Sequence, residues 1–349
     1  MNRGSRGGFF QVEACTFHEV VRLGMNPAVA YLVLSRFRNP KTSETRAGVH
    51  AVENYTGIGR TRAGRALDSL REKGFIEPAP SGSRIVVKCS LTGRRQRARP
   101  GGKKAEFSTH TAPPLEHWIH LPNEIVDGAA DETAPLELLR QMGDAMTLRL
   151  FLDLYREQLL PEDFGISRSV IFQPCTMTKV WEVGALNFWA YKGALTHCDV
   201  DSRAVNPHGR DFWARFGSLH QVGLILRIPV LFESAGSEAV PIYPFAESGT
   251  STERRLRDVL ADYVEGQMES SGERGRILRA KAEAIEHEGI IPVPMHYPSP
   301  SVVGIYRLRY LPSTSMTAAW HARIERFCKP AFDRFESSDL RSKNAASRG

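Results

Sequence analysis

Basic side chains are concentrated at one end of a helix that the sequence predicts near residue 60. The polar members of this cluster are Arg60, Thr61, Arg62 and Arg65. The apolar residues that alternate with them at helical spacing are Ala63, Ala66, Leu67 and Leu70. In a DNA major groove, arginine can donate a bidentate pair of hydrogen bonds to guanine O6 and N7. The pattern therefore predicts a helix with one face in a core and the opposite face free to bind nucleic acid.

A tight turn must connect this helix to the one before it. The sequence predicts a short helix over Arg46–Tyr55 and the basic helix over Arg60–Lys73. Between them, Gly57 and Gly59 supply the turn, and Ile58 is expected to fill the space between the two helices. Two helices that meet at an angle across a short glycine-containing turn form a helix-turn-helix unit.

Further elements are expected on both sides of this unit. An apolar stripe predicts an earlier helix over Asn26–Arg36, followed by a long polar loop over Phe37–Thr45. Gly74 ends the basic helix, and a strand begins at Phe75. After a turn, the alternation over Arg84–Lys88 predicts a returning strand. The order is therefore three helices followed by a strand hairpin.

This order resembles the winged helix-turn-helix domains of bacterial transcription regulators over roughly residues 20–90, most specifically over Tyr55–Ile76. In such domains the third helix lies in the major groove. The resemblance implies base or phosphate contacts from Arg60, Thr61, Arg62 and Arg65. It implies contacts from the hairpin, or wing, through Ser81, Ser83 and Arg84. A generic helical hairpin with solvated arginines and a protein-interaction module are the alternatives.

The charge of the chain is unevenly distributed along its 349 residues, which carry a formal net charge of +7. Residues 1–110 hold 20 basic and 8 acidic side chains, a net of +12, whereas the rest hold 26 basic and 31 acidic, a net of −5. Such asymmetry indicates a polyanion partner for the first third, with nucleic acid the leading candidate.

A basic linker is predicted over residues 92–114, where glycine and proline interrupt regular structure. Its basic side chains are Arg94, Arg95, Arg97, Arg99, Lys103 and Lys104. They either follow the phosphates or a minor groove, as a homeodomain arm does, or belong to a solvated linker.

A second segment repeats the pattern of helix end, glycine and apolar strand. The first copy is Leu67, Leu70, Gly74, Phe75 and Ile76, and the second is Phe216, Leu219, Gly223, Leu224 and Ile225. Unless these five positions recur by chance, they indicate a second winged unit with strands over Leu224–Phe232 and Val240–Phe245. This arrangement resembles the tandem winged helices of plasmid replication initiators.

The sequence thus predicts an α+β, mainly helical protein with an N-terminal winged helix-turn-helix and a second α+β domain. The expected boundaries are a flexible N-terminus over 1–17, the winged domain over 18–91 and the linker over 92–114. They continue with a second domain over 115–249, a C-terminal helical region over 250–336 and a flexible tail over 337–349.

Motifs for catalysis and metal binding are missing from the sequence. It contains no phosphate-binding loop, no G-x-S-x-G, no H-E-x-x-H and no C-x-x-C. The histidine pair His117 and His120 and the run His197–Asp199 have weak metal-ligand spacing, so we expect neither metal nor cofactor. The charged residues around Glu253 are interpreted as a solvated, salt-bridged helix face. Trp181, Trp189 and Trp213 could stack on bases, but packing in the core is the favoured interpretation.

The cellular setting is expected to be the cytoplasm. The cysteines are Cys15, Cys89, Cys175, Cys198 and Cys328, an odd and scattered set that fits a reducing compartment. The longest apolar runs are too short to span a membrane, and the N-terminus has no signal-peptide pattern.

We therefore expect a non-enzymatic protein that binds double-stranded DNA, most simply a bacterial transcriptional regulator, with a homodimer possible. Its acidic C-terminal two thirds would position the DNA-binding domain, form a dimer or contact a protein partner. The alternatives are a replication initiator of a plasmid or mobile element and an adaptor in a nucleoprotein assembly.

Overall fold

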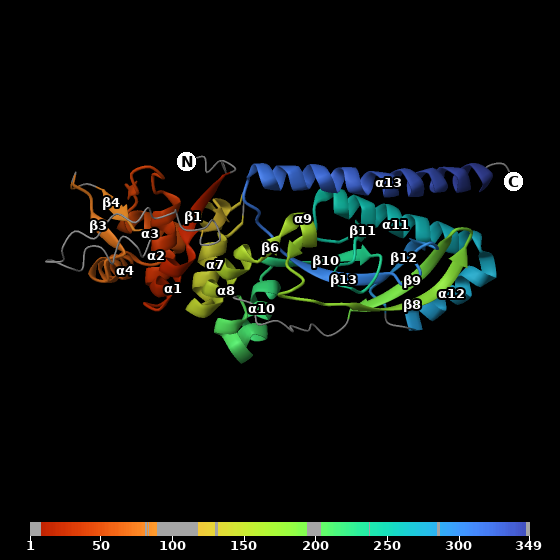
Figure 1. Cartoon of the computed structure of the whole chain (residues 1–349), viewed down its shortest axis with the longest axis horizontal. Coiled ribbons are helices and arrows are strands. Elements are labelled where there is room, and N and C mark those ends of the chain that lie inside the picture. The colour runs from red at the N-terminus through yellow and green to blue at the C-terminus, as the bar shows by residue number, and fades with distance from the viewer. Residues whose placement is uncertain are drawn as a thin grey trace, which may run out of the picture. The chain divides into compact units, whose positions relative to one another are not determined.

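The computed structural model describes residues 8–80, 82, 84–88, 118–129, 132–193, 204–236, 238–284 and 287–346. Over these ranges the chain mixes helices and small sheets, so the predicted α+β class is confirmed (Figure 1). Contacts between Cα atoms divide it into two compact units. The first is built from residues within 1–157, 203–224 and 308–315, and the second from residues within 158–202, 225–307 and 316–349.

The first unit begins with a strand that the sequence did not predict. The elements are β1 (Phe9–Glu13), α1 (Ala14–Val21) and β5 (Trp118–Pro122). β1 pairs antiparallel with β5, and Phe10 and Val12 are buried on one of its faces. The expectation of a flexible N-terminus up to residue 17 is therefore wrong for residues 9–17, because alternating apolar side chains build a strand there.

Three helices and a small sheet follow in the first unit. The helices are α2 (Met25–Arg36), α3 (Val49–Thr56) and α4 (Arg60–Glu72). The strands are β2 (Glu44–Thr45), β3 (Ile76–Pro78) and β4 (Ile85–Val87), in the antiparallel order β2-β4-β3. The three helices contact one another in every pair. α2 is the central one, since every residue from Pro27 to Ser35 is buried.

The predicted turn between α3 and α4 is confirmed. Gly57 has φ 65°, in the left-handed region that glycine adopts without strain, and it ends α3. Ile58 is 3% exposed and fills the core between the helices, as predicted. At the far end of α4, Gly74 has φ 71°, and the chain turns into β3.

The rest of the first unit is helical. Its elements are α6 (Glu124–Asp127), α7 (Pro135–Met142), α8 (Ala145–Arg156), the 3-10 helix η2 (Asn206–Asp211) and α10 (Phe212–Gln221). Gly143, with φ 76°, divides α7 from α8. Because α7 contacts α2 and α3, the predicted boundary at residue 115 does not coincide with the boundary between the compact units.

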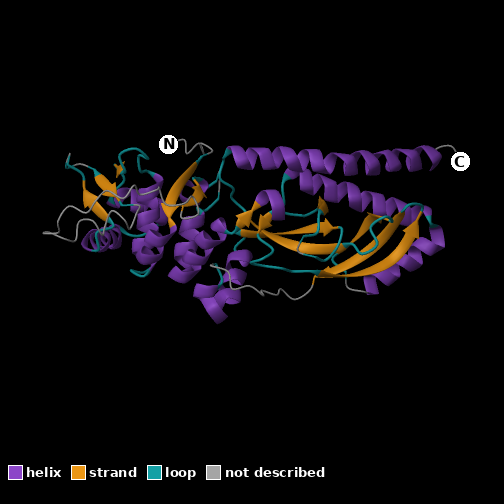
Figure 2. Cartoon of the chain, in the orientation of Figure 1, coloured by secondary structure: helices purple, strands orange, loops and turns teal. Residues whose placement is uncertain are grey.

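The second unit combines three small sheets with helices, as the strand and helix colours of Figure 2 show. Its strands are β6 (Gln158–Leu159), β7 (Gly165–Ile166), β8 (Cys175–Val183), β9 (Leu186–Gly193), β10 (Ile225–Phe232), β11 (Pro241–Pro244), β12 (Gly289–Pro294) and β13 (Ser301–Leu308). The sheet orders are β12-β9-β8, β11-β10-β13 and β6-β7. The helices are α9 (Leu160–Asp163), α11 (Ser251–Ser270), α12 (Gly272–Ala284) and α13 (Ser315–Ala346).

Two predictions for this C-terminal part need correction. The region 250–336 is not wholly helical, because β12 and β13 lie within it and join different sheets. The predicted flexible tail over 337–349 is wrong for residues 337–346, since α13 continues to Ala346. No helix within the described residues combines the length and the apolar character needed to span a membrane.

The prediction of a solvated face around Glu253 is wrong for Glu253 itself, which is fully buried. With Thr250 it forms a capping box at the start of α11. Arg307 on β13 donates two hydrogen bonds to its carboxylate, at 2.9 and 3.0 Å. Burial alone would raise the pKa of Glu253, but the charge and hydrogen bonds of Arg307 outweigh it and hold the pKa below its ordinary value.

Candidate nucleic-acid interface

Helix α4 presents two chemically different faces. Its buried side chains are Ala63, Ala66, Leu67 and Leu70, each at most 4% exposed. Its exposed side chains include Arg60, Thr61, Arg62 and Arg65. Because α2 and α3 contact α4, the apolar face is fixed in the core of the first unit and the basic face is held toward solvent. The predicted separation of the two faces is therefore confirmed.

The arginines of the basic face are unpaired, whereas Arg71, farther along the same helix, forms an ion pair. Among the described residues, the guanidinium groups of Arg60, Arg62 and Arg65 have no hydrogen-bond or ion-pair partner. Arg71, on the same helix, donates to Asp68 at 2.8 Å. Three unneutralised cations at one end of an anchored helix form a surface that suits an anionic partner.

Gly64 lies between the basic residues of this face. It costs about 0.8–1 kcal/mol of helix stability relative to alanine. A Cβ atom at Gly64 would meet nothing within 4 Å, so packing inside the protein does not require a glycine here. A glycine at this position leaves the helix backbone open to close approach from outside the chain.

The strand hairpin beside α4 has less free charge than the sequence indicated. Arg84, predicted as a wing contact, lies 2.9 Å from the carboxylate of Glu44, and Lys88 lies 2.6 Å from Glu77. The sequence missed the Glu44 partner because β2 lies within the predicted loop. The predicted contacts Ser81, Ser83, Arg94, Arg95, Arg97 and Arg99 lie outside the described residues.

The weak metal-binding candidates receive no support from the described residues. His120 lies on β5, where its Nε2 is 2.9 Å from Gln11 Nε2, and burial lowers its pKa. No group of three or more histidine, cysteine, aspartate or glutamate side chains in the described part of the chain could hold a metal ion. His117 and the run His197–Asp199 lie outside that part. Cys15, Cys175 and Cys328 are not joined by disulfide bonds, and Cys89 and Cys198 are not described.

The tryptophans divide between core and surface. Trp181 is 5% exposed and its ring lies 4.8 Å from that of Phe188, so the core interpretation is confirmed for it. Trp189 is half-buried. Trp213 on α10 is 37% exposed and makes edge contacts with Phe212 and Phe216.

A buried ionic cluster in the first unit was missed by sequence reasoning. His18 Nε2 on α1 lies 2.7 Å from Asp153 Oδ1 on α8, and Arg149 lies close to both, at 3.3 and 3.4 Å. Asp153 is only 2% exposed. No spacing in the sequence relates residues so far apart, and the cluster joins α1 to α8.

A second cluster joins α8 to α10. Arg215 Nε donates to Asp144 Oδ2 at 2.8 Å, and its Nη1 lies 3.4 Å from His208 Nδ1. Burial lowers the pKa of His208 to about 4. These charges are paired within the chain, so they hold helices in place rather than present a binding surface.

The repeated helix end found in the sequence has a structural counterpart. Gly74 and Gly223 have φ 71° and 73°. The following residue donates to a carbonyl five residues back in both, Phe75 to Leu70 at 2.8 Å and Leu224 to Leu219 at 3.0 Å. However, α10 belongs to the first compact unit, whereas β10 and β11 belong to the second.

The basic face of α4 is thus a surface of the described residues whose cations have no partner within the chain. Its groups are hydrogen-bond donors and cations, which can bind an anion but do not by themselves break a covalent bond. Comparison of the chain with protein-family models, with curated proteins and with solved structures finds no match.

Proposed function

We propose that the protein binds double-stranded DNA through a winged helix-turn-helix made of α2, α3, α4 and the sheet β2-β4-β3. The observation that carries this proposal is the row of exposed, unpaired guanidinium groups of Arg60, Arg62 and Arg65 on α4. A helix of about 10–12 Å diameter fits the B-DNA major groove, where arginine reads guanine. Thr61 adds a hydroxyl group that can contact a base or a phosphate.

The proposal includes two further parts of the interface. The hairpin β3–β4 and the basic residues of the sequence at 94–99 would contact the DNA backbone and fix the register of α4 without reading sequence. Since phosphate contacts supply most non-specific affinity, the net charge of +12 over residues 1–110 favours this partner.

We infer a transcriptional regulator of a bacterial cytoplasm as the biological role, without enzymatic activity. The second candidate is a replication initiator of a plasmid or mobile element. The observation that favours it is the second helix end at Gly223, where the hydrogen bond of the following residue repeats that seen at Gly74. The strands β10 and β11 come next in the chain, although they belong to the other compact unit.

Selection of binding sites from random double-stranded DNA, followed by footprinting, tests the proposal and separates the roles. A regulator protects one or two palindromic sites near promoters, and an initiator protects directly repeated sites in an AT-rich origin. Failure to enrich any sequence contradicts sequence-specific binding. Copurification with other proteins, together with weak and unspecific DNA affinity, would identify an adaptor instead.

A further inference from the structure

Helix α4 carries carboxylates as well as arginines on the side that faces away from the core. The buried residues of the helix are Ala63, Ala66, Leu67 and Leu70. At 3.6 residues per turn, the opposite side carries four exposed residues, which we call the outer ridge: Thr61, Arg65, Asp68 and Glu72. Asp68 therefore lies one turn beyond Arg65 and leaves the helix on the same side.

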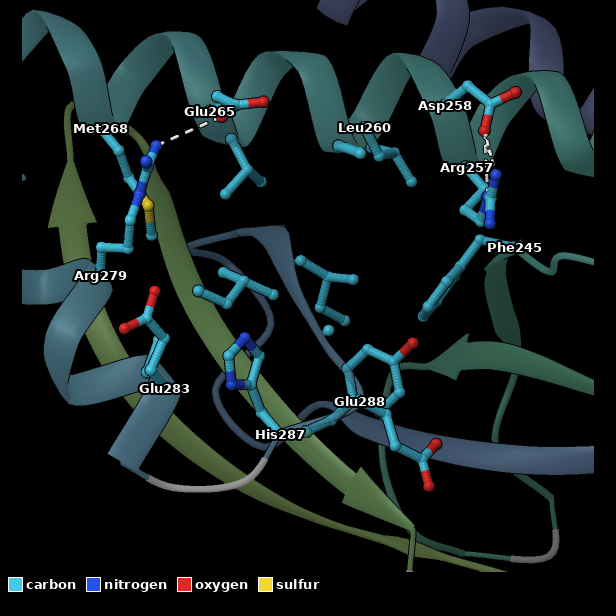
Figure 3. Close-up of a pocket in the computed structure, with 17 residues that line it drawn as sticks. Phe245, Arg257, Asp258, Leu260, Glu265, Met268, Arg279, Glu283, His287 and Glu288 are labelled. Carbon is cyan, nitrogen blue, oxygen red and sulfur yellow. Dashed lines mark hydrogen bonds and ion pairs between the residues drawn. The ribbon is translucent and has the colours of Figure 1, made fainter.

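The ion pair that Asp68 makes does not hold elements of the fold together. Asp68 accepts a hydrogen bond from Arg71, which lies one turn farther along the same helix, and its side chain is 62% exposed. Exposed pairs within one helix contribute little to stability. By contrast, Arg279 on α12 reaches Glu265 on α11, as Figure 3 shows, so that pair joins two helices. Packing within the chain therefore gives no reason for a carboxylate at position 68.

The ion pair does fix the direction of the Asp68 carboxylate. Arg71 Nη1 donates to Oδ1 at 2.8 Å, and Oδ2 has no hydrogen-bond partner among the described residues. Since Asp68 pairs with Arg71 and not with Arg65, the guanidinium group of Arg65 also stays unpaired. The outer ridge thus presents a group of donors and, one turn away, a free acceptor.

The base edges of the major groove can bind both groups. Arginine donates to guanine O6 and N7, and a carboxylate accepts from the N4 amino group of cytosine. Along the helix axis Arg65 and Asp68 are about 4.5 Å apart, close to the base-pair rise of about 3.4 Å. The two side chains can therefore reach neighbouring base pairs.

We infer that Asp68 determines specificity by reading a cytosine beside the guanine read by Arg65, with Arg71 as the residue that positions its carboxylate. The inference rests on the proposed DNA binding and adds the identity of a second base. Phosphates repel a carboxylate, so Asp68 adds no affinity for the DNA backbone. Without an amino group at the base edge this repulsion is not offset, and the carboxylate therefore contributes discrimination between sites.

Affinities for a selected duplex, and for duplexes changed at one base pair at a time, test the inference. The position at which Arg65→Ala loses its preference identifies the guanine. At the neighbouring cytosine, replacement by thymine is expected to weaken wild-type binding about tenfold. Asp68→Ala should bind both duplexes equally, and Asp68→Asn should prefer adenine, because asparagine pairs with adenine N6 and N7. Arg71→Gln should reduce the preference for cytosine without a change in thermal stability.

The matched control is Glu19→Gln, which breaks the exposed pair of Glu19 and Arg22, also one turn apart and in the same unit. It should keep the wild-type preference at every position. Wild-type preferences in Asp68→Ala and Asp68→Asn, or a selected site without cytosine beside the guanine, overturn the inference and leave DNA binding by α4 intact. If the wild type selects no site at all, the proposed function itself fails, and the role of Asp68 fails with it.

Discussion

At the residue scale, the buried pair of Glu253 and Arg307 decides how the second unit is held together. The two side chains are 0% and 3% exposed, and Arg307 also donates to the carbonyl of Phe164 at 2.6 Å and lies 4.6 Å from the Trp320 ring. Each charge is stable out of water only because the other is present, so the pair is sensitive to loss of one partner.

Replacement of Glu253 by leucine is expected to cost about 3–5 kcal/mol of unfolding free energy, because the Arg307 guanidinium is left buried and unpaired. The double variant Glu253→Leu with Arg307→Met should recover most of this loss, since neither charge remains. Urea denaturation measures both. Glu273→Gln serves as the exposed control, and a single-variant loss no larger than that of the control contradicts the argument.

His208 gives a prediction for pH dependence. Burial lowers its pKa to about 4 in the folded state, whereas an unfolded histidine titrates near 6.5. Between these two values the unfolded state binds the proton and the folded state does not, so the unfolding free energy falls as pH decreases from 6.5 to 4. Denaturation at pH 7 and at pH 4.5 should therefore show a smaller loss for His208→Gln than for the wild type. An equal loss in both proteins would show that His208 does not titrate in this way.

At the element scale, the helices with a strong apolar stripe and a glycine end could be predicted from the sequence. α4 and α10, which are followed closely by Gly74 and Gly223, lie within two residues of their expected bounds, because the stripe and the stop are local signals. α2 also lies within two residues of its expected bounds, although Phe37 and not a glycine follows it. β2 could not be predicted, since its two residues become a strand only by pairing with β4. The burial of Glu253 was equally hidden, because its partner Arg307 lies on β13.

Gly64 on α4 gives the prediction at this scale. Gly64→Ala is expected to stabilise the fold by about 0.8–1 kcal/mol through helix propensity, because a Cβ atom there meets nothing. The same variant should weaken DNA binding, since the added methyl group keeps the helix backbone away from the groove. Thermal unfolding and a gel-shift titration measure the two effects.

The matched control is Gly266→Ala on α11, where a Cβ atom also meets nothing within 4 Å. It should stabilise the fold by a similar amount and leave DNA affinity unchanged. If both variants bind DNA as the wild type does, close approach of the backbone at Gly64 is refuted.

At the scale of the whole molecule, the uneven distribution of charge could be predicted from the sequence, but the division into compact units could not. The excess of +12 over residues 1–110 is a linear property and is visible in the composition. The first compact unit also takes residues from 203–224 and 308–315, which no composition shift marks. The candidate interface could be predicted as well, because Arg60, Arg62 and Arg65 are close neighbours in the sequence.

The charge of the whole molecule predicts a steep response to salt. About six phosphate contacts would give a slope near −5 for the logarithm of the binding constant against the logarithm of salt concentration. Titrations with duplex DNA at several salt concentrations measure this slope. A flat response would remove DNA as the partner.

The most direct test of the central claim is the affinity of arginine variants of α4 for a selected DNA site. Arg62→Ala and Arg65→Ala are each expected to lose about 1–3 kcal/mol of binding free energy if these side chains read bases. The control is Arg22→Ala, at the exposed arginine that follows α1 in the same unit, and it should bind as the wild type does. Gel-shift affinities of Arg62→Ala and Arg65→Ala equal to that of Arg22→Ala would contradict the assignment of α4 as the DNA-reading helix.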